Sequence, residues 1–142
     1  MIEEGVVADV ISAEERRAIE WDCARLINLY AMLNDEARWT DVAALYAEDG
    51  SMTRPTAPDA PIVGRAAILA AFTARPPRIT RHMTANIVVD VVDADNATAT
   101  SAMLLFTAPD KPPLVGGFVD RLRRVSDEGW RFVERRGTLS FA

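Results

Sequence analysis

The spacing of apolar residues changes at His82, and this change limits the choice of fold more than any other feature. Ahead of it, apolar residues mostly recur every three or four positions, which is typical of helices that bury one face. After it, β-branched residues dominate segments separated by polar turns, as in strands. Helices followed by a run of strands predict an α+β fold, in which the helices cover one face of an antiparallel sheet.

The first predicted helix starts at a capping box formed by Ser12 and Glu15. In this motif the hydroxyl and the carboxylate satisfy the free amide groups of the first helical turn. The helix ends near Asn34 and Asp35, which are poor helix formers. It carries an apolar stripe on one face, made of Ile19, Cys23, Leu26, Ile27, Tyr30 and Leu33.

A second short helix is predicted from Trp39 to Tyr46, closed at Gly50, where glycine tolerates a left-handed turn. Residues 51–54 are strand-like. Three prolines then predict an exposed loop, because proline disrupts regular elements. They are Pro55, Pro58 and Pro61.

A third short helix is predicted over residues 64–72, before Pro76 and Pro77 stop it. Residues 126–129 form a turn that predicts a hairpin, so neighbouring strands are expected to be antiparallel. The expected strands cover residues 87–92, 97–107, 115–125 and 130–139.

A chain of 142 residues is long enough for one core, so we expect residues 1–12 as an N-terminal arm and residues 13–142 as one domain. The net charge of −5 would repel a polyphosphate backbone, which argues against nucleic acid as a partner. The single Cys23 allows no disulfide within the chain and fits a reducing cytoplasm. No apolar run reaches the ~20 residues of a membrane span. We expect a soluble cytoplasmic protein without a membrane partner.

The order of the predicted elements resembles the SnoaL-like family of the nuclear-transport-factor-two-like superfamily. Residues 45–50, Leu-Tyr-Ala-Glu-Asp-Gly, and residues 129–132, Gly-Trp-Arg-Phe, add to this resemblance, which covers roughly residues 13–140. It implies a cystatin-like α+β barrel, in which a curved mixed or antiparallel sheet forms a cone around a long N-terminal helix and two short ones. It also implies an apolar pocket in the cone and a homodimer or higher homo-oligomer formed through the open sheet face.

His82 is the only histidine of the chain and the first candidate for a catalytic residue. Imidazole gains or loses a proton near neutral pH, but it needs a partner that orients it. Dehydratases and dehydrochlorinases of the resembled superfamily pair such a histidine with an aspartate at the end of the first helix. Asp35, fourteen residues before Asp49, and His82, four residues before Asn86, match those positions. The resemblance therefore implies His82 as general base, oriented by Asp35.

Each of these two residues also has an ordinary explanation. A histidine at a strand end often bonds only to backbone, and aspartate is common where helices end. The dehydratase set is also incomplete, because a second histidine is missing and two tyrosines are replaced by Asn34 and Arg54. The isomerase relatives would place their general base at Arg54, which does not accept a proton at neutral pH.

Five further residues are candidates for substrate binding. The isomerase relatives imply a phenolic donor at Tyr30 and an acid at Asp120. Strand alternation puts Asp120 on the same face as Phe118 and Leu122. There it could bind substrate, or it could form an ion pair across the sheet with Arg121, Arg123 or Arg124. Two of the candidates also have a simpler explanation, since Tyr30 could pack in the core and Arg54 could be a solvated loop residue. The full set of candidates is Tyr30, Arg54, Phe106, Phe118 and Asp120.

The expected function is a cofactor-independent lyase of the dehydratase type, or an isomerase. It would act on an apolar cyclic or aromatic metabolite through dehydration, elimination or isomerisation. No metal or cofactor is expected, because the sequence has no metal-ligand spacing and no glycine-rich phosphate loop. The alternative is a non-catalytic small-ligand-binding or assembly module on the same fold, since a fold does not determine a function.

Overall fold

Nine helices and strands make up the part of the chain that the computed structural model describes, residues 10–141. The predicted N-terminal arm falls largely outside this range, and of it only residues 10–12 are described. In order the elements are α1 (Ala13–Asp35), α2 (Trp39–Ala44), β1 (Tyr46–Thr53), β2 (Ile62–Val63), α3 (Arg65–Thr73), β3 (Arg81–Asp93), β4 (Asn96–Phe106), β5 (Leu114–Val125) and β6 (Gly129–Leu139).

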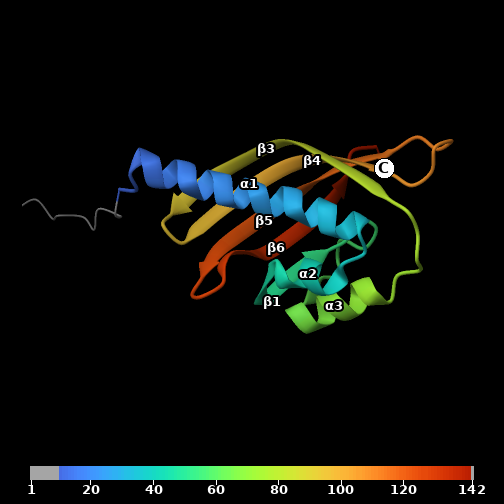
Figure 1. Ribbon diagram of the computed structural model, residues 1–142, viewed down its shortest axis with the longest axis horizontal. Coiled ribbons are helices and arrows are strands. Elements are labelled where there is room, and N and C mark those ends of the chain that lie inside the picture. The colour runs from blue at the N-terminus through green and yellow to red at the C-terminus, as the bar shows by residue number, and fades with distance from the viewer. Residues whose placement is uncertain (1–9, 142) are drawn as a thin grey trace, which may run out of the picture.

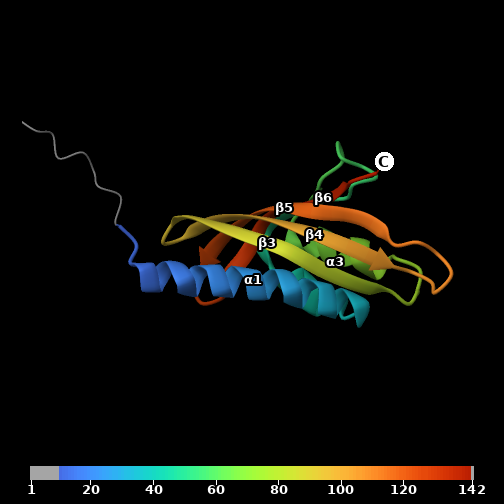
Figure 2. The same cartoon turned by 90° about the horizontal axis from the view of Figure 1, so that it is seen from above.

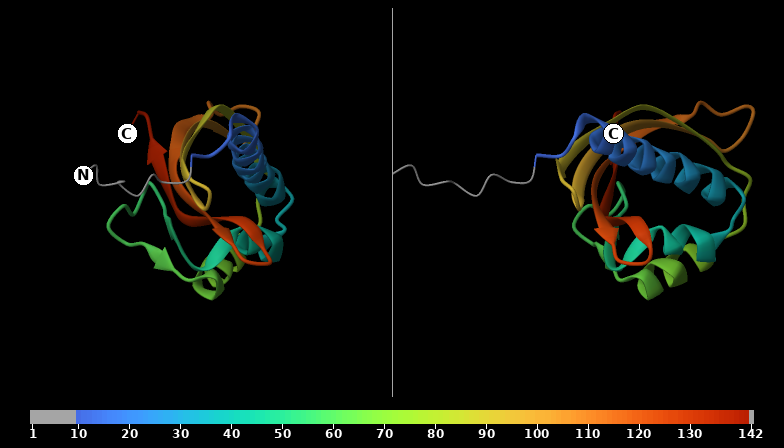
Figure 3. Two further views of the ribbon diagram at one scale, coloured as in Figure 1. Left: turned by 90° about the vertical axis from the view of Figure 1, so that its left-hand side faces the viewer. Right: turned by 60° about the vertical axis from the view of Figure 1, so that its left-hand side comes forward.

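The strands form one six-stranded sheet in the order β2-β1-β6-β5-β4-β3. Strands β3 to β6 pair antiparallel with their chain neighbours, whereas β1 runs parallel to β6, so the sheet is mixed. The sheet curves around α1 (Figures 1 and 3), and α2 and α3 lie together beside the β1 end of the sheet. Seen from above, α1 runs along the sheet (Figure 2). The predicted α+β cone on a long N-terminal helix is confirmed.

Helix α1 begins as its sequence predicts. The Ser12 hydroxyl accepts a hydrogen bond of 3.0 Å from the backbone N–H of Glu15. The whole predicted apolar stripe is buried and joins the core between α1 and the sheet, while Trp21 on another face of the helix is 71% exposed. Among residues 10–141, no helix has the length and apolar character needed to cross a membrane.

The second helix is shorter than predicted, and the sequence interpretation of residues 46–50 was wrong. Helix α2 ends at Ala44, and β1 begins at Tyr46 because this segment pairs with β6. Gly50 therefore does not close a helix. A Cβ atom at this position would lie 2.8 Å from the carbonyl oxygen of Phe132, so glycine is needed where β1 approaches β6. In this segment, long-range strand pairing overrides the local helix propensity.

A β-bulge in β3 sets the direction of the His82 side chain. The register against β4 shifts between Ala85 and Val88, and Asn86 has a left-handed φ of 53°. An extra residue in a strand reverses the alternation of side chains beyond it. His82 therefore lies on the same face as Ile87, although strict alternation would separate them. This is the face that packs toward α1.

Replacing Asn86 tests the bulge. A β-branched residue disfavours the left-handed conformation, so we expect Asn86→Val to lower the free energy of unfolding by about 1–2 kcal/mol. Asn86→Gly, which suits a positive φ, is the matched control and should stay close to the wild type. Urea unfolding of the three proteins measures both. Equal stabilities of the valine and glycine variants would show that the left-handed residue does not set the register.

Candidate active site

Asp35 and His82, 47 residues apart in the sequence, are in direct contact. Asp35 is the last residue of α1, and His82 is the second residue of β3. The imidazole Nδ1 lies 2.5 Å from Asp35 Oδ1, and the backbone N–H of His82 donates to Asp35 Oδ2 at 2.8 Å. One carboxylate therefore holds both the ring and the backbone of the histidine.

Thr80 completes this arrangement, and the sequence analysis did not identify it. Its hydroxyl donates to Asp35 Oδ1 at 2.9 Å. The only signal in the sequence was its place two residues before His82. With three donors around it, the carboxylate has little freedom to turn. If Nδ1 carries the proton that it donates to Asp35, the lone pair of Nε2 is left for a substrate.

The Asp35–His82 pair lines a groove between the last turns of α1 and the start of β3. This groove has a volume of about 500 Å³, and its walls include Asn28, Met32 and Thr84. The side chains of His82 and Asp35 are only 11% and 14% exposed. The pair is thus shielded from bulk water but open to a small molecule in the groove, as a proton-transfer site requires.

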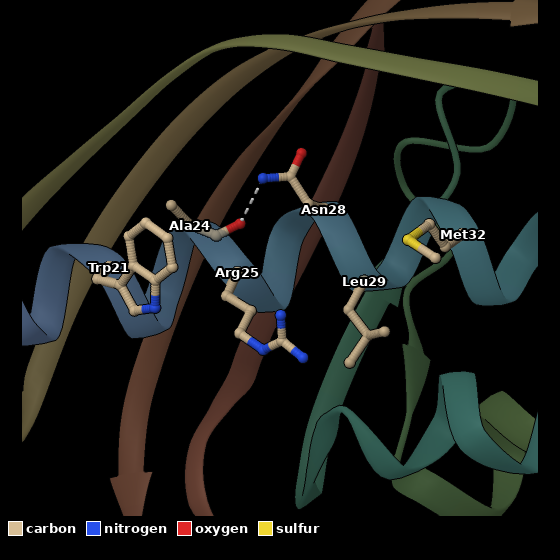
Figure 4. A pocket seen from close by; sticks show the side chains of 6 residues that line it. All are labelled: Trp21, Ala24, Arg25, Asn28, Leu29 and Met32. Atoms are coloured by element: carbon tan, nitrogen blue, oxygen red, sulfur yellow. Dashed lines mark hydrogen bonds between the residues drawn. The ribbon is translucent and has the colours of Figure 1, made fainter.

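A second groove lies along α1 (Figure 4). It has a volume of about 290 Å³ and shares Asn28 and Met32 with the first. Its remaining lining residues are Trp21, Ala24, Arg25 and Leu29, and all six side chains come from α1. Asn28 is fixed by a hydrogen bond of 3.0 Å from its amide to the carbonyl of Ala24.

Asp120 pairs with Arg135 in the interior of the cone. The sequence analysis named Arg121, Arg123 and Arg124 as its partners, and the structure shows none of them there. They pair instead with Glu134, with Asp49, and with Asp95 and Glu15. Arg135 lies inside because the register of β5 and β6 shifts between Arg121 and Leu122, which adds a residue to β6.

The Asp120–Arg135 pair is fully buried and its geometry is loose. Arg135 Nε lies 3.7 Å from Asp120 Oδ1, and neither carboxylate oxygen has a hydrogen-bond partner among residues 10–141. Burial raises the pKa of Asp120 to about 6, although the charge of Arg135 opposes this rise. Removal from water therefore outweighs the attraction between the two charges.

Tyr30 and Phe118 surround the Arg135 guanidinium rather than an open pocket. Its carbon lies 4.3 Å from the Tyr30 ring centre, 3.7 Å from that of Phe118 and 4.6 Å from that of Phe132. Such contacts stabilise a buried cation. These side chains fill the middle of the cone, whereas the two grooves described above are lined by α1 and by the start of β3.

The other two predicted binding residues lie apart from this cluster. Phe106 follows the buried Leu105 and lies on the outward face of the sheet, where it is 37% exposed. Its backbone pairs with Arg81, next to His82 in β3, but the side chains of Phe106 and His82 lie on opposite faces of the sheet. Arg54 directly follows β1, and its guanidinium donates to the carbonyl of Ala71 in α3 at 3.4 Å. Within residues 10–141, no group of three His, Cys, Asp or Glu side chains is arranged to hold a metal ion.

Solved structures with this architecture include enzymes. A protein assigned to the scytalone dehydratases of Novosphingobium aromaticivorans has a TM-score of 0.79 and 23% identity, covering 92% of this chain and 89% of its own. A hexachlorocyclohexane dehydrochlorinase has a TM-score of 0.79 and 16% identity, with coverages of 92% and 90%. A nuclear-transport-factor-two-like protein with a cystatin-like fold, also from N. aromaticivorans, has a TM-score of 0.75 and 26% identity, with coverages of 91% and 84%. No curated protein matches the chain in sequence.

The curved sheet around a long N-terminal helix defines the class of protein as the nuclear-transport-factor-two-like superfamily. Residues 14–136 match the SnoaL-like domain, and the chain belongs to this family.

Proposed function

We propose that the chain is a small-molecule enzyme in which His82 abstracts a proton while Asp35 orients its ring. The observation that carries this proposal is the contact of 2.5 Å between His82 Nδ1 and Asp35 Oδ1, both of which line a groove. A carboxylate that accepts from Nδ1 fixes the tautomer and leaves Nε2 as the base. It also stabilises the positive charge that the ring acquires with the proton.

Elimination is the reaction type that we propose. Nε2 of His82 takes a proton from a carbon of the substrate, and the electrons of the broken C–H bond form a carbon–carbon double bond. The leaving group departs from the adjacent carbon with its own electron pair, and the proton on His82 is then passed to it or to water. A dehydratase and a dehydrochlorinase among the similar structures bear names of this chemistry, which supports the proposal.

The substrate that we propose is an apolar cyclic or aromatic metabolite. The groove beside His82 is lined by the apolar parts of Ala31, Met32 and Ile79 as well as by polar groups. We assign no direct contact with the substrate to Tyr30, Phe118 and Asp120, because they pack around Arg135.

Proton abstraction is tested by incubating the protein in D₂O with a panel of ring-bearing alcohols, halides and ketones. We expect loss of water or halide, or uptake of deuterium at an acidic carbon, from at least one class of compound. NMR and mass spectrometry detect these products without knowledge of the pathway. Saturable binding of panel members with no exchange and no product would favour the second candidate, a non-catalytic binding module.

We also propose that two copies associate through the outward face of the sheet. Exposed apolar residues gather there on three adjacent strands, namely Met83, Val88, Val92, Phe106 and Val119. Val88 and Val119 both oppose Thr100 of β4, so they lie in one row across the sheet. Light scattering should give twice the mass of the chain, and Val119→Lys should give the mass of one chain. An equal mass for both proteins would contradict this interface.

A further inference from the structure

Three arginines line one hollow between the end of β1 and the loop after α3. Arg54 follows β1, and Arg75 and Arg78 belong to the loop after α3. Together with Pro76 they enclose a volume of about 360 Å³. We call Arg54, Arg75 and Arg78 the arginine cluster.

The arginine cluster carries positive charge that the described part of the chain does not balance. Within residues 10–141, no carboxylate forms an ion pair with any of its members, although the chain has an acidic net charge of −5. Other arginines of the fold, such as Arg38, Arg65 and Arg123, do contact carboxylates. A guanidinium stays protonated at any physiological pH, so the members of the cluster repel one another.

The guanidinium of Arg75 is held in place by stacking. Its carbon lies 4.3 Å from the centre of the Phe72 ring, which stacks on Trp39 with ring centres 5.3 Å apart. Burial, together with the neighbouring charges of Arg54 and Arg78, lowers the pKa of Arg75. A stacked guanidinium keeps its N–H edges free for an anion in its plane.

Arg54 also has unused hydrogen-bonding capacity. Its Nε is buried and has no hydrogen-bond partner in the described part of the chain, and its Nη2 donates one long bond of 3.4 Å to the carbonyl of Ala71. A buried donor without a partner is costly, and a ligand that accepts from it would remove that cost. Pro76 and Pro77 restrict the loop that carries the other two arginines, which reduces the cost of ordering it around a ligand.

Shared lining residues place the hollow at the arginine cluster close to the Asp35–His82 pair, with Thr80 between them. An adjoining hollow of about 230 Å³ is lined by Arg75, Arg78 and Thr80, among others. The Thr80 hydroxyl is the group that donates to Asp35 Oδ1. The groove of His82 is lined by Thr80 as well. A ligand with one end at the arginines can therefore extend toward the imidazole.

We propose that the apolar ring of the ligand bears one oxyanion, a carboxylate or a phosphate, which the arginine cluster binds while the ring itself extends toward His82. Charge-assisted bonds from guanidinium groups suit both anions, since each offers two or more acceptor oxygens. The inference rests on the proposed function only for the reacting end of the ligand. The binding of the anion itself does not depend on catalysis.

Isothermal titration calorimetry with benzoate, phenyl phosphate, inorganic phosphate and neutral benzamide tests this proposal. We expect the aromatic anions to bind and benzamide to bind at least about tenfold more weakly, from the usual strength of a charge-assisted bond. Arg75→Gln and Arg78→Gln should each weaken benzoate or phenyl phosphate by about 10- to 100-fold. Arg17→Gln, which removes an exposed charge from the start of α1, is the matched control and should bind as the wild type does.

The outcomes separate this proposal from the proposed catalysis. His82→Gln should still bind the anions, so intact binding with no turnover in any protein would retain the anion site and reject the enzyme. Tighter binding of phenyl phosphate than of benzoate would identify phosphate as the natural group, and the reverse order would identify carboxylate. Equal binding of benzamide and benzoate, wild-type binding by both arginine variants with unchanged thermal unfolding, or no binding of any anion would overturn the proposal.

Discussion

Replacing His82 by glutamine is expected to lower kcat/KM on any compound that the protein turns over by about 100- to 10,000-fold, the usual contribution of a general base. Glutamine is similar in size and can still donate to Asp35 through its amide, but it cannot take a proton at neutral pH. The loss should therefore appear in kcat rather than in KM. Steady-state kinetics on the substrate found in the D₂O panel measure both.

Two further variants show whether the loss belongs to the proton-transfer pair. Asp35→Asn keeps the size of the side chain but lacks the negative charge that orients and stabilises the ring, so we expect a kcat loss of similar order. Asp90→Asn makes the same chemical change at an exposed position of β3 that does not line the groove, and it should leave kcat close to the wild type. Wild-type kcat in His82→Gln, or an equal loss in all three variants, would remove His82 from the reaction.

Asp120→Asn is expected to make the protein more stable near neutral pH. The pKa of Asp120 is raised from 3.8 to about 6, mainly because burial disfavours the charged form. A rise of about two units corresponds to about 3 kcal/mol. Arg135 keeps its three aromatic contacts without the aspartate, and these contacts continue to stabilise its positive charge. Asparagine resembles the neutral acid in size and should remove this cost of ionisation.

The sign of the pH dependence follows from the protons bound. Between pH 3.8 and about 6, Asp120 is protonated in the folded protein and ionised in the unfolded chain. The folded state then binds more protons, so its stability falls as the pH rises through this range. Below it both states are protonated, and above it both are ionised. The free energy of unfolding of the wild type, relative to Asp120→Asn, should thus drop by about 2.4 kcal/mol from pH 4 to pH 7.

Urea unfolding of both proteins at several pH values measures this difference. Asp90→Asn, at an exposed position on β3, is the control and should not change the shape of the pH curve. Parallel curves for the wild type and Asp120→Asn would show that Asp120 ionises with an ordinary pKa.

Much of the fold could be predicted from local signals. The Ser12 cap and the apolar stripe of α1 depend on neighbouring residues within a few turns, and both are confirmed. The alternation in β4, where Ala97 and Ala99 are buried between exposed threonines, also follows from a period of two. The hairpin turns could be found for the same reason, since their polar residues and glycine act locally.

The errors arose where pairing between distant strands decides the structure. Residues 46–50 carry no local signal for a strand. They form one because they pair with β6. Two of the bulges, at Asn86 in β3 and opposite Leu122 in β6, break the period of two, so strict alternation assigns the residues beyond them to the wrong face. Arg135 was missed as the partner of Asp120 for this reason.

The candidate site could be found only through the family resemblance. Asp35 and His82 are far apart in the sequence, and nothing local to either residue indicates the other. The resemblance named both, and the fold brings them into contact. The arginine cluster had no such guide beyond Arg54, because its members gather only when the end of β1 meets the loop after α3.

The tautomer of His82 tests the central claim most directly, because the chain has a single histidine and its ¹⁵N signals need no further assignment. With the ring neutral, we predict a protonated Nδ1 and an unprotonated Nε2 in the wild type, and loss of this preference in Asp35→Asn. A proton on Nε2 of the wild-type ring, or the same mixture of tautomers in both proteins, would contradict an imidazole oriented by Asp35 for proton abstraction.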